Sequence, residues 1–175
     1  MPPPPLSPGR QPLADFGTRL LAYLIDAAII SAVAMVVALP VLLIFVFTQM
    51  NELVALDPYG PQPDVFGDFV GPLLLIEFGL ILLIMAGNYV YYVEMLFRSG
   101  QTVGKRVMKI RVVPIDPAAS LTRTMAAKRY LVEFVGGGFI PFFNYLDGLW
   151  QLWDKPYLQT LHDKFAQTVV IKVSA

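Results

Sequence analysis

The apolar stretch from Thr18 to Phe47 constrains this chain most, because Asp26 is its only charged side chain after Leu20. A helix rises about 1.5 Å per residue, and the hydrocarbon core of a bilayer is about 30 Å thick. As a helix, this stretch would therefore be longer than the core is thick. The run is also too long for the apolar core of a secretory signal, which is roughly 7–15 residues. We therefore predict a retained transmembrane helix over residues 19–47.

A second apolar run, residues 71–97, is long enough to cross back, and 56% hydrophobic with 15% charged residues is a membrane-protein composition. Residues 48–70 between the two runs are rich in turn formers and predict an outer loop. The proline-rich residues 1–14 predict a disordered tail. Residues 15–175 are expected to form one membrane domain.

Charge is distributed unevenly and predicts the orientation. The segment 98–130 holds one acid, Asp116, and eight basic residues, whereas the loop 48–70 holds acids and no base. Because cytoplasmic loops carry the excess of Lys and Arg, we expect the basic segment and the N-terminus to be cytoplasmic in a multi-pass protein of the bacterial inner membrane. The basic residues are Arg98, Lys105, Arg106, Lys109, Arg111, Arg123, Lys128 and Arg129.

Two β-branched segments, Val107–Val113 and Thr168–Val173, predict strands that pair with each other, since a lone strand leaves its backbone unpaired. Pairing would place the tail 154–175 in the cytoplasm. Between the strands, Ser120 is a candidate N-cap for a helix over residues 122–135. Its Arg123, Lys128 and Arg129 suit a helix face that lies on anionic lipid.

The third apolar segment, residues 131–153, is interrupted by three consecutive glycines and by Pro141. Two interpretations stay open: a third full crossing, or a re-entrant helix–break–helix hairpin whose broken backbone is buried in protein. We favour the hairpin. The predicted fold class is therefore mainly α, a helical membrane protein with two long transmembrane helices, a third broken or re-entrant segment, and a small cytoplasmic two-stranded β element.

Five acids lie in or beside the apolar segments, and acids in a membrane are costly enough that a partner or a function is the default expectation. Asp26 has no basic residue three or four positions away along its helix. Arg19 lies two turns before it on nearly the same face, and a guanidinium can bind two carboxylates. Its candidate partners are Asp26, Asp15 and an acid from the tail. The five acids are Asp26, Glu77, Glu94, Glu133 and Asp147.

Enzymatic chemistry finds little support in the residues. The single histidine, His162, stands beside Asp163, but no serine or cysteine nucleophile is spaced near this pair. One histidine without any cysteine is too few for a typical metal site, and Gly100–Gly104 lacks the spacing of a phosphate-binding loop. We expect no catalytic residue, metal or cofactor, and the zero net charge gives no reason to expect nucleic acid.

Three motifs carry a resemblance: RLLAYLID (Arg19–Asp26), GQTVGKRVMKIRVV (Gly100–Val113) and QTLHDKFAQTVVI (Gln159–Ile171). Over roughly residues 15–173 the chain resembles the RDD family of bacterial membrane proteins, named for one arginine and two aspartates. The resemblance implies that Arg19, Asp26 and Asp163 are these residues, and that the protein transports unidentified ligands. One departure is Gln167, where related sequences usually have glycine.

We predict that Arg19, Asp26 and Asp163 form one charged cluster at the cytoplasmic end of the helices, with Asp147 as a further candidate. The cytoplasmic motif is expected to include Gly100, Gln101, Thr102, Gly104, Lys105, Arg106 and His162. The cluster would serve an oligomeric transporter of a proton, a monovalent cation or a small ligand, or it would be scaffolding. In the second case the protein is an accessory subunit that binds another membrane protein or anionic lipid in the bilayer.

Overall fold

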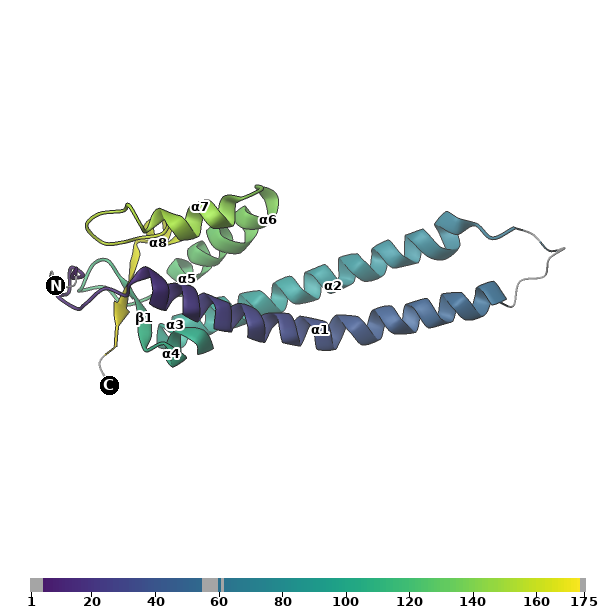
Figure 1. Ribbon diagram of the computed structural model, residues 1–175, viewed down its shortest axis with the longest axis horizontal. Coiled ribbons are helices and arrows are strands. Elements are labelled where there is room, and N and C mark those ends of the chain that lie inside the picture. The colour runs from purple at the N-terminus through teal and green to yellow at the C-terminus, as the bar shows by residue number, and fades with distance from the viewer. Residues whose placement is uncertain (1–4, 55–59, 61, 174–175) are drawn as a thin grey trace. The chain divides into compact units, whose positions relative to one another are not determined.

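The computed structural model describes residues 5–54, 60 and 62–173, and it is mainly helical (Figure 1). The described chain forms two compact units. One unit contains the residues up to Ala28 together with those from Asn88 onward, and the other contains Ile29–Gly87. The long helix α1 (Phe16–Val54) belongs to both units, as does the helical run Val65–Ser99.

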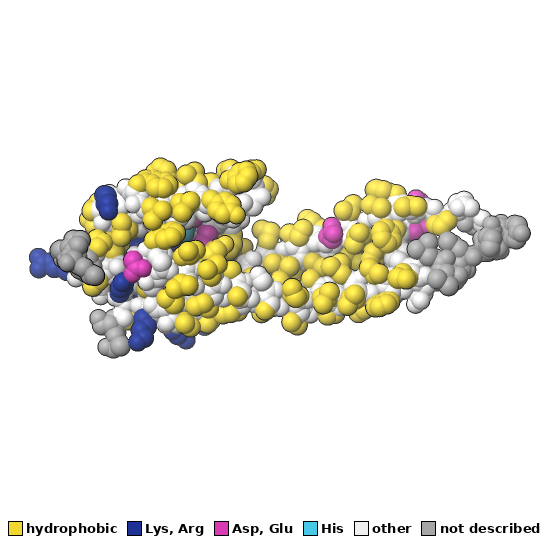
Figure 2. All heavy atoms as spheres, in the orientation of Figure 1, with side chains coloured by type: hydrophobic (Ala, Val, Ile, Leu, Met, Phe, Trp, Pro, Cys, Tyr) yellow, Lys and Arg dark blue, Asp and Glu magenta, His cyan; other side chains and the backbone are white. Residues whose placement is uncertain are grey.

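The unit Ile29–Gly87 is made of two apolar helical segments. It holds most of α1 and, after the π-helical turn η1 (Val65–Val70), most of α2 (Gly71–Tyr89). The rings of Phe45 and Phe69 pack against each other, with their centroids 5.5 Å apart. Yellow apolar side chains cover this unit in Figure 2, and none of the residues of α2 is buried. Both long helices have the length and composition to cross a membrane, as predicted.

The loop predicted over residues 48–70 was too long at both ends. Residues 48–54 continue α1, because Gln49, Met50 and Glu52 are good helix formers and no proline lies between Pro40 and Pro58. At the other end, Asp64 caps η1 by accepting a hydrogen bond from the Phe66 amide at 3.2 Å. Residues 55–59 and 61 of the predicted loop lie outside the described residues.

The larger unit contains the predicted sheet, in which β1 (Ile110–Pro114) pairs antiparallel with β2 (Thr168–Lys172). Val112 lies opposite Val170, and both side chains are buried. The first strand starts later than predicted, since Val107 ends the short helix α4 (Val103–Val107). Between α8 (Leu161–Ala166) and β2, Gln167 has φ 55°, a left-handed conformation that glycine adopts most readily.

The N-terminal segment corrects another expectation. Residues 5–14, predicted to be disordered, pack along the free edge of β2: Leu13 forms a β-bridge with Ile171, and the Ala14 amide donates to the Val170 carbonyl at 2.9 Å. Leu13 is buried with Val169 and Ile171. The segment is ordered because it covers the otherwise unpaired edge of β2 and buries Leu13 there. These contacts outweigh the disorder that its proline content predicted. Residues 1–4 lie outside the described residues.

The broken apolar segment forms a helix–break–helix hairpin, as we favoured, but residues 138–142 at its break are exposed and are not buried in protein as expected. Its first arm contains α5 (Arg123–Tyr130), the π-helical η3 (Leu131–Gly136) and α6 (Gly137–Phe139), and its second arm is α7 (Phe143–Trp150). The chain reverses at Phe142, whose φ is 63°. The N-cap of α5 is Thr122 and not Ser120 as predicted. Thr122 Oγ1 accepts a hydrogen bond from the Met125 amide at 3.2 Å.

Before α4, the chain continues from α2 through the π-helical η2 (Val90–Glu94) and α3 (Met95–Ser99). Helix α3 ends at Gly100, which has a φ of 70°. A Cβ there would lie 2.9 Å from the Val112 carbonyl oxygen. Glycine is therefore required at this turn, where η2, α3 and α4 bring residues 88–107 back to the start of α1.

Candidate functional site

Asp163 is held at the start of α8 by a reciprocal cap. The Thr160 amide donates to Asp163 Oδ2 at 3.2 Å, and the Asp163 amide donates to Thr160 Oγ1 at 3.2 Å. This capping box fixes the carboxylate in a fully buried position. The short helix therefore serves to place one negative charge inside the protein.

Arg19 is the first partner of that charge, as predicted from the tail acids. Its Nη1 lies 3.1 Å from Asp163 Oδ2 and also donates to the Leu158 carbonyl at 2.8 Å. Nε donates to the Ala14 carbonyl at 3.1 Å, and Nη2 donates to the Val170 carbonyl at 3.3 Å. One guanidinium thus joins α1, the N-terminal segment, β2 and the loop before α8.

Arg129 is the second partner, and sequence reasoning missed it. Its Nη1 pairs with Asp163 Oδ1 and donates to Thr168 Oγ1 at 2.6 Å, and the residue is only 4% exposed. The prediction that Arg129 faces anionic lipid was therefore wrong. Glu133 stands one turn further along the helix, but the hydrogen bonds and ion pair of Arg129 with described residues go to Asp163 and Thr168.

We call Arg19, Arg129, Asp163 and Thr168 the Asp163 cluster. Burial alone would raise the pKa of Asp163, but the charge of Arg129, with further help from His162 and Arg19, outweighs burial and holds that pKa well below its usual range. Asp163 is therefore ionised at neutral pH. Two guanidinium groups share this one carboxylate.

Asp26 has different partners, which we call the Asp26 cluster: Asp26, Tyr91, Thr102, Gly104 and Lys105. Its Oδ1 accepts from the Tyr91 hydroxyl at 2.6 Å and from the Gly104 amide at 2.7 Å. Its Oδ2 accepts from Thr102 Oγ1 at 2.5 Å and lies 3.9 Å from Lys105 Nζ. Three neutral donors and one distant ammonium group therefore satisfy a fully buried carboxylate.

Gly104 explains why the cytoplasmic motif has its sequence. A Cβ at this position would lie 2.1 Å from the Ala22 carbonyl oxygen and 2.9 Å from Asp26 Oδ1, so only glycine lets α4 approach α1 this closely. Thr102 caps α4, and Gln101 Nε2 donates to the Ile110 carbonyl at 2.8 Å. Arg106 is exposed. The motif is thus built to bind Asp26.

The expected single cluster of Arg19, Asp26 and Asp163 is therefore wrong in one member. Among the described residues, no hydrogen bond or ion pair joins Arg19 to Asp26, because the side chains of α4 and η2 take the place beside Asp26. The needed signal lay far away in sequence, in Thr102 and Gly104. Tyr91 donates its hydroxyl hydrogen to Asp26 from η2, also far away in sequence.

His162 and Asp147 form a separate pair. His162 Nδ1 lies 2.6 Å from Asp147 Oδ2, and the His162 amide donates to Asp147 Oδ1 at 2.8 Å. The His162 side chain therefore pairs with Asp147 of α7 and does not form a dyad with its neighbour Asp163. The pair connects the second arm of the hairpin to α8.

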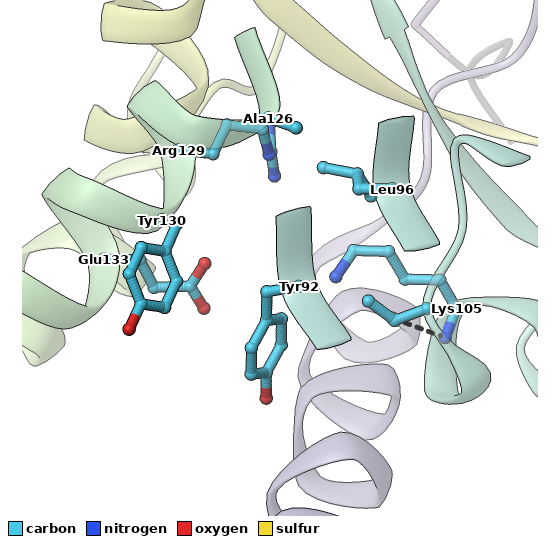
Figure 3. A pocket seen from close by; sticks show the side chains of 8 residues that line it. Tyr92, Leu96, Lys105, Ala126, Arg129, Tyr130 and Glu133 are labelled. Carbon is cyan, nitrogen blue, oxygen red and sulfur yellow. Dashed lines mark hydrogen bonds between the residues drawn. The ribbon is translucent and has the colours of Figure 1, made fainter. Parts of the chain in front are cut away.

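Lys105, Arg129 and Glu133 point into a small pocket of about 10 Å³, as Figure 3 shows. Burial lowers the pKa of Lys105, although Glu133 opposes this shift. A space of this size holds about one water molecule. The same three side chains also line one end of a much larger cavity.

The larger cavity has a volume of about 520 Å³ and lies within the unit that contains both clusters. Its walls come from the first turns of α1 and from η3, α7 and α8. Figure 2 shows charged side chains among apolar ones on this part of the molecule. The lining includes the apolar Phe16, Leu20, Leu24, Phe134 and Leu149 and the charged Arg19, Lys105, Arg129, Glu133, Asp147 and Asp163.

Comparison with known proteins identifies a family. The model of the RDD family matches residues 13–167, which is most of the chain and includes the Asp26 cluster and every member of the Asp163 cluster except Thr168. No curated protein and no solved structure matches the chain.

Proposed function

The chain belongs to the RDD family, and we propose that it is an accessory, non-transporting protein of the bacterial inner membrane that binds anionic lipid at the cytoplasmic face. In this proposal the two long apolar helices anchor the unit that holds both clusters. The basic segment then meets the headgroups, with the N-terminus on the same side.

The observation that carries this proposal is that most basic residues of the segment 98–130 are exposed, whereas three aspartates are buried and hydrogen-bonded. Six of the eight basic residues in 98–130 are exposed. Asp26, Asp147 and Asp163 are buried and hydrogen-bonded. Basic residues near an anionic surface each contribute about 1 kcal/mol to binding. The exposed ones are Arg98, Arg106, Lys109, Arg111, Arg123 and Lys128.

The hydrogen bonds and ion pairs of Asp26 and Asp163 argue against a role for these carboxylates as ion carriers. To bind a proton or cation, Asp26 would have to give up short hydrogen bonds from Tyr91, Thr102 and Gly104. Asp163 would have to leave two guanidinium groups. Removing one partner of a buried ion pair costs about 3–5 kcal/mol. Both carboxylates are therefore better suited to hold the fold.

Lipid enrichment around the reconstituted protein tests the proposal. Energy transfer from Trp150 and Trp153 to a headgroup-labelled anionic lipid should be stronger than transfer to a zwitterionic one. The excess should fall when Arg106, Lys109 and Arg111 are all changed to Gln, and also in high salt. As a matched control, Glu52→Gln with Asp64→Asn and Asp68→Asn neutralises three charges in another region and should leave the excess unchanged.

Equal transfer to both lipids by the wild type would refute lipid binding at this face. A membrane protein that co-purifies with the wild type and is lost from the Arg106, Lys109 and Arg111 variant would move the accessory role to a protein partner.

One observation favours a second candidate, an oligomeric transporter. The apolar faces of α1 and α2 are largely exposed, and two crossings alone enclose no pathway, so several copies would have to assemble through these faces. Proton or monovalent-cation flux in sealed vesicles, absent in Asp26→Asn but kept in Asp68→Asn, would support transport. Silent wild-type vesicles would remove this candidate.

A further inference from the structure

The cavity of about 520 Å³ combines an apolar wall with polar groups that lack partners. Its volume lies in the roughly 300–1,000 Å³ range of small-molecule sites. Phe16, Leu20, Leu24 and Phe134 supply the apolar wall. Such a wall fits hydrocarbon, and the polar groups determine what that hydrocarbon must carry.

Two cationic side chains in the lining keep donors to spare. The hydrogen bonds of Arg129 to the described residues all use Nη1, so Nε and Nη2 are left over. Lys105 Nζ is 3.9 Å from Asp26, beyond hydrogen-bond distance. Figure 3 shows both side chains directed into the small pocket, and both also line the larger cavity. Spare donors on two cations favour an anionic group with several acceptor oxygens.

Two acceptors in the same lining are also available to a ligand, the buried amide oxygen of Gln151 and the half-buried carboxylate of Glu133. Gln151 is 6% exposed, and its Oε1 is buried without a hydrogen-bond partner in the described structure, while its Nε2 donates to the Gly148 carbonyl at 2.7 Å. Glu133 forms no hydrogen bond or ion pair with a described residue, although its carboxylate points into the small pocket (Figure 3). A buried acceptor such as Gln151 Oε1 needs a donor, which a fatty-acid carboxylate does not offer at neutral pH.

These requirements together narrow the ligand. It needs hydrocarbon for the apolar wall, anionic oxygens for Arg129 and Lys105, and hydroxyl groups for Gln151 and Glu133. The Glu133 carboxylate also disfavours a doubly charged phosphomonoester, so a singly charged phosphodiester fits better. The cavity can hold a headgroup and the first part of an acyl chain, but not a whole diacyl lipid.

We infer that this cavity binds the headgroup of an anionic phospholipid whose phosphodiester carries hydroxyl groups, as glycerol does. The inference rests on the proposed function and deepens it, because it adds a selective internal site to a basic surface that recognises charge alone. Arg129 and Lys105 bind the phosphodiester oxygens. Gln151 Oε1 and the Glu133 carboxylate accept from the hydroxyls.

The test uses the full chain in detergent and four probes, with bound lipid measured by native mass spectrometry. Phosphatidylglycerol has the charge and the hydroxyls, phosphatidylethanol has the charge alone, and phosphatidylcholine has no net charge. Free glycerol 3-phosphate has no acyl chain. We expect phosphatidylglycerol to bind roughly tenfold more tightly than phosphatidylethanol, as one satisfied buried acceptor would give. Phosphatidylcholine and glycerol 3-phosphate should bind much more weakly.

Gln151→Leu should reduce the affinity for phosphatidylglycerol to that for phosphatidylethanol and leave phosphatidylethanol unchanged. Gln167→Leu is the matched control, since Gln167 Nε2 also donates to a carbonyl three residues back, at 2.9 Å, but on the surface and outside the cavity. It should keep the tenfold preference. Gln151→Glu, which keeps an acceptor and adds charge, should weaken both anionic lipids and provides a second variant if Gln151→Leu does not fold.

Equal affinities of the wild type for phosphatidylglycerol and phosphatidylethanol would overturn the inference, as would a full preference retained by Gln151→Leu. Glycerol 3-phosphate that binds as tightly as the lipid would overturn the assignment to a lipid. The proposed function fails separately, because charge-dependent enrichment in bilayers depends on the exposed Arg106, Lys109 and Arg111 and not on Gln151.

Discussion

Asp26 and Asp163, two of the buried carboxylates, are stabilised in different ways. Asp163 is paired with the guanidinium groups of Arg19 and Arg129, whereas Asp26 accepts from two hydroxyls and one backbone amide and has its nearest ammonium nitrogen at 3.9 Å. Both are fully buried. The difference shows that a membrane-adjacent charge can be satisfied either by countercharge or by preorganised neutral donors.

The two solutions also do different work in the fold. The Asp163 cluster ties the N-terminal segment, α1, α5, α8 and β2 together through charged side chains. The Asp26 cluster holds the segment Gly100–Val107, which contains α4, against α1 through a close approach of the two backbones. Loss of charge should therefore damage the first cluster more, and added volume should damage the second more.

Asp163→Asn should give the largest loss of stability, about 3–5 kcal/mol, because it leaves two buried guanidinium groups without a countercharge. Thermal unfolding of the purified protein in detergent measures this loss. Asp116→Asn is the control, since Asp116 is exposed and caps only the Ala118 amide. A loss no larger than that of the control would refute the structural role of the cluster.

Asp26→Asn should cost less, about 1.5–3 kcal/mol, because an amide keeps one acceptor oxygen and the hydroxyls of Tyr91 and Thr102 can reorient. The same unfolding measurement applies. An effect larger than that of Asp163→Asn would reverse the comparison between the clusters.

Gly104→Ala should cost about 1–3 kcal/mol through overpacking, since the new methyl group meets the Ala22 carbonyl. Gly87→Ala provides a matched helical control, because a Cβ there has nothing within 4 Å. That control should be neutral or stabilising. If the two variants unfold at the same temperature, the close approach of α4 to α1 is not as described.

Acid should weaken the Asp163 cluster in a defined direction. Its pKa is lower in the folded protein, so its contribution is complete above the usual aspartate pKa of about 3.9 and is lost as the pH falls through the folded value. Between pH 7 and pH 3 the loss from this group should be about 1 kcal/mol. Comparing chemical unfolding of wild type and Asp163→Asn at both pH values isolates it, and an unchanged difference would contradict the assignment.

Much of the fold could be predicted from the sequence because its signals are local. Two long apolar runs gave the two long helices, alternating β-branched residues gave the sheet, and three glycines with Pro141 gave the broken hairpin. The disordered tail was mispredicted since the pairing of Leu13 with Ile171 joins distant parts of the chain. Composition describes a segment alone and not the strand edge that it covers.

The site was only partly predictable, for a related reason. The residues alone left Asp26, Asp15 and a tail acid open as partners of Arg19, and the resemblance to the RDD family singled out Asp163, which is the partner found. Arg129 was misassigned, since one charged residue in a basic helix resembles its exposed neighbours until the position of Asp163 is known. Gln151 gave no local signal at all. Its importance lies in an oxygen whose missing partner is visible only in three dimensions.

The most direct test of the separation between the clusters is a pair of double-mutant cycles. Arg19→Gln is combined with Asp163→Asn in one cycle and with Asp26→Asn in the other, and the free energy of unfolding is measured for every variant. We expect a coupling energy of about 1–3 kcal/mol for Arg19 with Asp163, and one within about 0.5 kcal/mol of zero for Arg19 with Asp26. Strong coupling between Arg19 and Asp26 would contradict the account and restore a single cluster.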